Sequence, residues 1–375
     1  MQLCLGATYS WSVFVEPIKG ITGLMQGTVQ LPFSVFYFAF PAVMVVSGTL
    51  LPKFGPRKCA VFGGIVFGAG WLTATLGKIH FSYTVLGVGL MGGFGVGFAY
   101  IVPIATLIKW FPKQKGLVTG VAVAGFGGGA ALVSKFSGYL LTVSGMAPFD
   151  VFGIFGCIFF VLVVIAGSSM VNPPDINMKK NSSMKLKDFM GKGLFWILYF
   201  AMFSGLSAGF TVNANLKELY KGVTAEAGIT AVALFAVANA LGRISWGLFF
   251  DRVKSATAVR TNLLFQAAVL FASTLILTSD KGLYLFAILT GFNYGGILVV
   301  YASTIARKWG SDRVGQVYGW LFSANIPAAV SPIIAGYYFD MNGNFTLPLM
   351  IIAGLMTVAA TWGASRVAVG EEVMA

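Results

Sequence analysis

The chain has 375 residues, of which 57% are hydrophobic and only 10% are charged, and its formal net charge is +13. Because roughly a quarter of the residues of a soluble protein are charged, this composition excludes an ordinary soluble globular protein. The basic residues fall in short clusters between apolar blocks and form no single face or tail, so the positive charge does not indicate a nucleic-acid partner.

Long apolar blocks, divided by charges and helix breakers, predict membrane-spanning helices, because about 20 apolar residues cross the hydrocarbon core of a bilayer. The predicted spans, in chain order, are 1–18, 29–51, 58–77, 82–108, 115–140, 149–171, 193–214, 225–250, 257–278, 282–307, 315–339 and 345–367. We expect an all-α membrane protein with twelve transmembrane helices in two six-helix bundles, 1–171 and 193–375, joined by a linker at 172–192. The first block is short for a span, so we expect the given sequence to begin partway along the first helix.

The distribution of lysine and arginine predicts the orientation in the membrane. Eighteen of these residues lie in loops after even-numbered spans, in the linker or in the C-terminal tail, and five lie in loops after odd-numbered spans. Because cytoplasmic loops carry the excess of basic residues, we expect a multi-pass inner-membrane protein with both termini and the linker in the cytoplasm. The linker lysines either follow this rule or contact lipid head groups.

The two halves of the chain repeat one another at a constant spacing of 199 residues. Gly48 aligns with Gly247 after this shift, and Lys109–Trp110 aligns with Lys308–Trp309. Six spans duplicated in parallel are typical of transporters built from two halves, which bind substrate near the bilayer midplane between the halves.

The segment Gly247–Arg252 reads Gly-Leu-Phe-Phe-Asp-Arg and follows the eighth span. Together with the two-half plan, it resembles the major facilitator superfamily, which carries a Gly-x-x-x-Asp-Arg motif after spans 2 and 8. The resemblance implies a gating role for Asp251 and Arg252. The copy after span 2 departs from the motif, because Pro52 stands where the family has its aspartate.

Four further segments narrow the resemblance to the oxalate/formate antiporter and bacterial monocarboxylate transporter group. They are YSWSVFVEPI in the first span, KFGPR after the second, WFPKQKG after the fourth and NALGRISWG in the eighth. Their order and spacing are specific, and the likeness covers essentially the whole chain.

Arg243 is a single cation in the apolar eighth span, where it costs roughly 2.5–3.5 kcal/mol at the bilayer centre. The sequence places no acidic residue clearly at the same depth, so we expect the anionic partner to be a substrate carboxylate, held by the planar guanidinium through two hydrogen bonds. The resemblance implies the same role. The alternative is that Arg243 extends toward the cytoplasm or pairs with Asp251.

A second buried cation would favour a dicarboxylate. The oxalate exchangers have a lysine in span 11 where this chain has Asn325, so a monocarboxylate such as lactate or pyruvate matches the single charge better. Lys135 in span 5 is either a second cation of the site or a side chain that extends to the membrane surface.

The resemblance also implies a central cavity walled by aromatic residues. The matching positions are Tyr9, Tyr100, Phe126, Tyr294 and Phe322. Asn239 lies one helical turn before Arg243 and can donate to the substrate or steady the guanidinium. For each aromatic residue the alternative is contact with lipid or with a neighbouring helix.

These features predict a secondary active transporter of a small monocarboxylate, which works by alternating access in symport with a proton. The alternatives are an anion exchanger of the oxalate/formate type, a passive anion channel and a membrane-embedded enzyme. We expect no enzyme activity, since the one histidine, His80, lies in a predicted loop and the three cysteines have no metal-binding spacing. We expect a monomer in the lipid bilayer that binds a small carboxylate but no cofactor, metal or nucleic acid.

Overall fold

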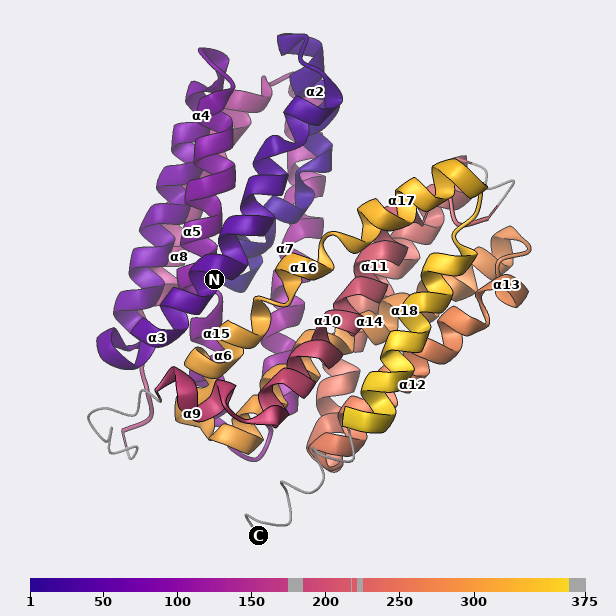
Figure 1. The fold of residues 1–375 in the computed structure, drawn as a ribbon. Coiled ribbons are helices and arrows are strands. Elements are labelled where there is room, and N and C mark those ends of the chain that lie inside the picture. Colours follow the sequence, from indigo (N-terminus) through magenta and orange to yellow (C-terminus); the bar gives the residue numbers. More distant parts are fainter. Residues whose placement is uncertain (175–184, 217, 221–224, 364–375) are drawn as a thin grey trace. The chain divides into compact units, whose positions relative to one another are not determined.

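The structure is a computed structural model, and it describes residues 1–174, 185–216, 218–220 and 225–363. All regular secondary structure in these ranges is helical, as Figure 1 shows, so the predicted all-α class is confirmed. Eight helical segments in this part of the chain are long and apolar enough to cross a membrane, and one of them, Thr28–Lys78, contains two of the predicted spans.

The first three predicted spans lie in three α-helices and two short 3₁₀-helices. These are α1 (Gln2–Leu5), η1 (Gly6–Ser10), α2 (Ser12–Thr22), α3 (Gln26–Thr73) and η2 (Ala74–Lys78). Helix α3 holds spans 2 and 3, and the predicted loop between them shrinks to a kink at Gly55, whose φ of 79° and ψ of 166° leave the helical region. Glycine adopts this backbone conformation at low cost because it has no Cβ.

The next three spans complete the first half of the chain. They consist of α4 (Ser82–Thr84), the π-helical η3 (Val85–Met91), α5 (Gly92–Ala99) and α6 (Ile101–Trp110) for span 4, α7 (Lys115–Thr142) for span 5, and α8 (Pro148–Ser168) for span 6. A proline at the start of α8 fits the first helical turn, where a backbone N–H has no partner within the helix.

A short helix, α9 (Leu186–Met190), lies in the predicted linker, and the second half follows. Its first four spans are α10 (Gly193–Asn215), α11 (Ala225–Arg252), α12 (Ser255–Phe271) with α13 (Ser273–Ile276), and α14 (Asp280–Trp309). The last span is α18 (Thr346–Val358), which continues into the π-helical η5 (Ala359–Gly363). Each of the twelve predicted spans therefore has a helical counterpart in the described residues.

Span 11 is not one continuous helix in the structure. Figure 1 shows this span in pieces, which are η4 (Ser311–Arg313), α15 (Val314–Phe322), α16 (Asn325–Ala328) and α17 (Ser331–Asn342). Pro327 and Pro332 lie in or next to the interrupted region. Proline has no N–H to donate to the preceding turn and its ring clashes there, so it interrupts a helix.

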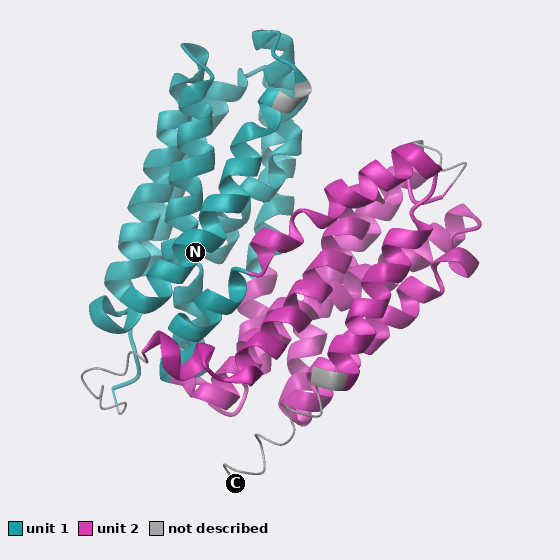
Figure 2. Ribbon diagram, viewed as in Figure 1, with its two compact units in different colours: residues 1–110, 125–183, 312–323 teal, residues 111–124, 184–311, 324–375 magenta. Residues whose placement is uncertain are grey.

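The chain forms two compact units, coloured separately in Figure 2. Unit 1 comprises Met1–Trp110, Gly125–Ser183 and Asp312–Ser323, and unit 2 comprises Phe111–Ala124, Met184–Ser311 and Ala324–Ala375. Each unit thus includes a short segment from the other half of the sequence. The bundle boundaries given in the sequence analysis stay a prediction.

Aromatic packing forms part of the core of unit 1. Trp11, Phe14, Trp71 and Phe152 are buried, and the ring centroids of Phe14 and Phe152 lie 4.9 Å apart while those of Trp71 and Phe152 lie 5.6 Å apart. These large buried rings fix α2, α3 and α8 against each other, because each removes a large apolar area from water or lipid and packs in a defined orientation.

Close packing of α11 on α14 builds the core of unit 2. A Cβ at Gly242 would lie 1.9 Å from the carbonyl oxygen of Phe292, and one at Gly295 would lie 2.2 Å from that of Asn239. These distances are too short for a real Cβ, so only glycine lets the two helix backbones approach this closely. Small residues are a common means of close helix packing in membranes. The pairing fixes the turn of α11 that carries Asn239 and Arg243.

Candidate functional site

Arg243 lies within unit 2, on α11, and only 7% of it is exposed. Its Nη1 donates a hydrogen bond to the backbone carbonyl of Val123, which belongs to α7. Its Nε is buried and has no hydrogen-bond partner among the described residues. Among the described residues, no acidic side chain forms an ion pair with Arg243.

Glycines bring the start of α7 against the end of α11. A Cβ at Gly116 would lie 2.2 Å from the carbonyl oxygen of Gly247, and one at Gly120 would lie 2.4 Å from that of Arg243. Val123 follows Gly120 by three residues and therefore lies on the same face of α7. This close approach puts the Val123 carbonyl within reach of the Arg243 guanidinium.

Asp251 joins the same two helices. Its two carboxylate oxygens accept hydrogen bonds from the backbone N–H groups of Gly116, at 2.8 Å, and Leu117, at 2.9 Å. These donors belong to the first turn of α7, where N–H groups have no partner within the helix and the helix dipole favours a negative charge. Arg252, the other residue implied in gating, is exposed.

Unit 1 contains the repeat-related version of this contact, between α3 and α15. A Cβ at Gly48 would lie 2.1 Å from the carbonyl oxygen of Gly315, and one at Gly319 would lie 2.7 Å from that of Met44. At the spacing of 199 residues, Met44 occupies the position of Arg243 and Pro52 that of Asp251. The backbone contact is therefore duplicated, but the arginine and the carboxylate occur in unit 2 alone.

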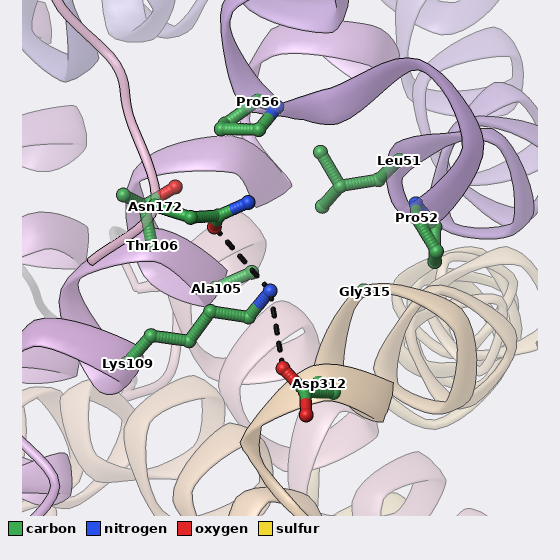
Figure 3. Close-up of a pocket in the computed structure, with 9 residues that line it drawn as sticks. All are labelled: Leu51, Pro52, Pro56, Ala105, Thr106, Lys109, Asn172, Asp312 and Gly315. Atoms are coloured by element: carbon green, nitrogen blue, oxygen red, sulfur yellow. Dashed lines mark hydrogen bonds and ion pairs between the residues drawn. The ribbon is translucent and has the colours of Figure 1, made fainter. Parts of the chain in front are cut away.

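A lysine–aspartate pair lies beside the contact in unit 1. Lys109 Nζ lies 3.3 Å from Asp312 Oδ1 and 3.3 Å from Asn172 Oδ1, as Figure 3 shows. The small pocket around them is also lined by Leu51, Pro52, Pro56, Ala105, Thr106 and Gly315. Sequence reasoning did not identify this pair, although Lys109 belongs to the first copy of the repeated Lys-Trp landmark and Asp312 follows the second copy.

The structure brings four of the five predicted cavity aromatics together in unit 1. The ring centroid of Phe126 lies 5.0 Å from that of Tyr9 and 5.1 Å from that of Tyr100, and Tyr100 lies 5.7 Å from Phe322. Phe40 joins this group, at 5.2 Å from Tyr100 and 5.1 Å from Phe322. Phe40 was missed by sequence reasoning, and the signal that could have found it is the repeat, since it aligns with Asn239 at the spacing of 199 residues.

The remaining predicted residues lie in unit 2 with Arg243. Asn239 and Asn325 are 8% and 7% exposed, and Tyr294 packs against Phe210 and Phe235 at centroid distances of 6.1 and 6.0 Å. Lys135, the other cation considered for the site, lies in unit 1 and is exposed. Buried amides and a buried guanidinium are groups that can donate hydrogen bonds to an anion. The substrate-binding and gating roles of these residues stay predictions.

Comparison with known proteins places this geometry in context. The oxalate:formate antiporter of Oxalobacter formigenes is 26% identical over 338 residues, which cover 88% of this chain and 80% of the antiporter. Human monocarboxylate transporter 2 is 22% identical over 404 residues, covering 96% of this chain and 82% of the transporter. A crystal structure of the Escherichia coli fucose:proton symporter FucP has the same fold, with a TM-score of 0.76, 14% identity and coverage of 97% of both chains.

The family model described as Major Facilitator Superfamily matches residues 1–332. The match agrees with the helical architecture, the internal duplication and the Gly-x-x-x-Asp-Arg segment, and it confirms the predicted twelve-helix fold class. The chain is a multi-pass membrane transporter that belongs to the major facilitator superfamily.

Proposed function

We propose that this protein carries a small monocarboxylate across the membrane by alternating access, with Arg243 as the carboxylate site. The proposal rests on one observation: Arg243 of α11 is buried, and its Nε has no hydrogen-bond partner among the described residues. A guanidinium remains charged at any physiological pH and matches a carboxylate through paired N–H donors. The relatives named for oxalate, formate and monocarboxylates support this class of substrate.

A single carboxylate suits the charge of the proposed site. Asn325 is buried but neutral, and Lys135 is exposed, so Arg243 is the cation that the proposal assigns to the substrate. A dicarboxylate would bring a second negative charge into a medium of low dielectric constant without a matching cation, which is costly. Short monocarboxylates such as lactate and pyruvate avoid this cost.

The neighbouring residues supply orientation and apolar surface in this proposal. Asn239 lies one turn before Arg243 on α11 and can donate its amide to the second carboxylate oxygen. Tyr9, Tyr100, Phe126 and Phe322, together with Phe40, offer aromatic surface for a short alkyl group, and Tyr294 does so in unit 2. Their role as the walls of one central cavity remains the prediction made from the family resemblance.

Uptake into proteoliposomes tests the substrate. We expect saturable uptake of labelled lactate or pyruvate by the wild-type protein, weaker uptake of oxalate, and loss of uptake in Arg243→Gln. Arg260→Gln is the matched control, because Arg260 is exposed on α12 and has no part in the proposed site. Uptake that stays unchanged in Arg243→Gln, or that rises linearly without saturation, would contradict the proposal.

Anion exchange is the second candidate for the mode of transport. The observations that favour it are the relative named as an oxalate:formate antiporter and the placement of the nine described acidic residues, each of which is exposed or half-buried. Proton symport, the mode predicted from the sequence, requires a group that gains and loses a proton during transport. Stimulation of uptake by unlabelled anion inside the vesicles indicates exchange, and stimulation by an inward proton gradient indicates symport.

A further inference from the structure

The two repeat-related helix contacts differ at one chemically important position. In unit 2, α7 packs on α11 and the Arg243 side chain bonds to the Val123 carbonyl of α7. In unit 1, α15 packs on α3 in the same way, but Met44 stands at the position of Arg243. A methionine cannot donate a hydrogen bond, so the α7–α11 contact has a charged link that its counterpart lacks.

The charged link uses the same side chain that the proposed function assigns to the substrate. A guanidinium has five N–H donors in a fixed planar arrangement, and Nη1 of Arg243 is committed to Val123. A carboxylate that binds the guanidinium through paired donors is a stronger acceptor than a neutral backbone carbonyl, because it is charged. A bound carboxylate also neutralises the charge that strengthens the Nη1 bond to the Val123 carbonyl, so the carboxylate and the carbonyl compete for the positive charge of one group.

We propose that the Val123 carbonyl is a built-in competitor for the anion on Arg243, so that binding of a carboxylate loosens α7 from α11. This inference rests on the proposed function, since it takes the carboxylate as the ligand of Arg243. Without ligand, the Arg243–Val123 bond and the Asp251 carboxylate hold the start of α7 against α11. With ligand, the Arg243–Val123 bond weakens because the carboxylate is the stronger acceptor for the same cation, and the contact opens more readily.

Thermodynamic linkage determines how far, and in which direction, a ligand shifts the equilibrium between the closed and the open α7–α11 contact. A hydrogen bond to a charged, buried group shifts an equilibrium on the order of ten- to a hundred-fold. A ligand that breaks this bond favours the open contact by up to that factor, and the closed contact weakens binding of the ligand by the same factor. The ligand-free carrier then opens this contact rarely, as exchange of one anion for another requires.

A distance measurement between spin labels tests the competition. The labels replace Lys113, just before α7, and Lys254, just after α11, which are both exposed and both in unit 2. The background replaces Cys4, Cys59 and Cys157 by serine. A second pair, at Lys53 and Arg313 in unit 1, reports on the repeat-related contact and on correct folding of each variant.

The comparison uses wild type and Arg243→Met, which places at 243 the residue type already found at the repeat-related position. We expect lactate to increase the population of long Lys113–Lys254 distances in the wild type. In Arg243→Met, this population should be raised on the order of ten-fold without lactate and should not respond to it. The Lys53–Arg313 distance should be the same in the ligand-free wild type and the ligand-free variant.

Different results would contradict the competition on Arg243 and the proposed substrate site. If ligand-free Arg243→Met has the wild-type Lys113–Lys254 distances, Arg243 does not hold the contact and the inference is wrong, whatever lactate does. If lactate binds wild type without changing these distances, the competition is wrong while the proposed function stands. If the variant opens the contact but lactate, pyruvate, formate and oxalate leave the wild-type distances unchanged and bind nowhere, the proposed function is wrong and Arg243 acts as a link between helices.

Discussion

Removal of the Asp251 carboxylate should loosen the start of α7 from the end of α11. Asp251 accepts two hydrogen bonds, at 2.8 and 2.9 Å, from the first turn of α7, and it is half-buried. A side chain that caps a helix N-terminus contributes about 0.5–2 kcal/mol, and its charge adds about 0.3–1 kcal/mol through the helix dipole. Because water reaches a half-buried site and replaces part of this energy, we expect Asp251→Ala to cost about 1–2 kcal/mol.

This cost corresponds to a roughly 5- to 30-fold larger population of the open contact, provided that the closed form dominates. Asp251→Asn keeps one acceptor oxygen and loses the charge, so we expect an effect of roughly half that free energy. The matched control is Asp340→Asn, because Asp340 is exposed on α17, in a different part of unit 2.

A cysteine at position 119 provides the assay. Thr119 is fully buried on the first turns of α7, within the segment that packs on α11. In a background without native cysteines, the rate at which a maleimide labels Thr119→Cys follows the open population when closing is faster than labelling. We expect Asp251→Ala to raise this rate roughly 5- to 30-fold. An unchanged rate in Asp251→Ala would refute the claim that the carboxylate holds α7.

Three further substitutions test other parts of the account. Gly120→Ala should abolish transport, because its Cβ would lie 2.4 Å from the Arg243 carbonyl oxygen, whereas Gly138→Ala on the same helix meets no atom within 4 Å and should remain active. Asn325→Lys should shift preference from lactate toward oxalate in competition assays, because it adds a second cation at the position where the family resemblance implies one in the oxalate exchangers. Asn342→Lys, at an exposed position, should not. Lys109→Gln should change the free energy of unfolding by no more than about 1 kcal/mol in thermal denaturation, because Asp312, its partner, has a side chain that is 49% exposed.

The positions of the spans could be predicted from the sequence because membrane insertion imposes simple requirements on length and charge. Blocks such as 115–140 and 225–250 are apolar, long enough and bounded by lysine or arginine, and they correspond to α7 and α11. The breaks within spans were harder to predict. Gly55 alone separates spans 2 and 3, and span 11 is divided next to its prolines, because local backbone geometry decides such breaks and hydropathy does not report it.

The candidate site, like the fold, could be predicted only in part from the sequence. Arg243 could be identified from the sequence because a cation inside an apolar span is costly and therefore unusual. The Val123 carbonyl could not, because every residue carries a backbone carbonyl and the choice among them depends on how α7 approaches α11 through Gly116 and Gly120. The repeat showed from the sequence that Pro52 stands at the position of Asp251. It also places Met44 at the position of Arg243, so one helix contact differs in chemistry from the other.

Equilibrium binding of labelled lactate or pyruvate to the purified protein tests the central claim most directly. The claim is that the Arg243 guanidinium binds the substrate carboxylate. We expect saturable binding to wild type and to the exposed-site control Arg260→Gln, and affinity weaker by roughly 10- to 100-fold or more in Arg243→Gln, because a charge-assisted pair is lost. Binding to a folded Arg243→Gln protein with wild-type affinity would contradict the claim.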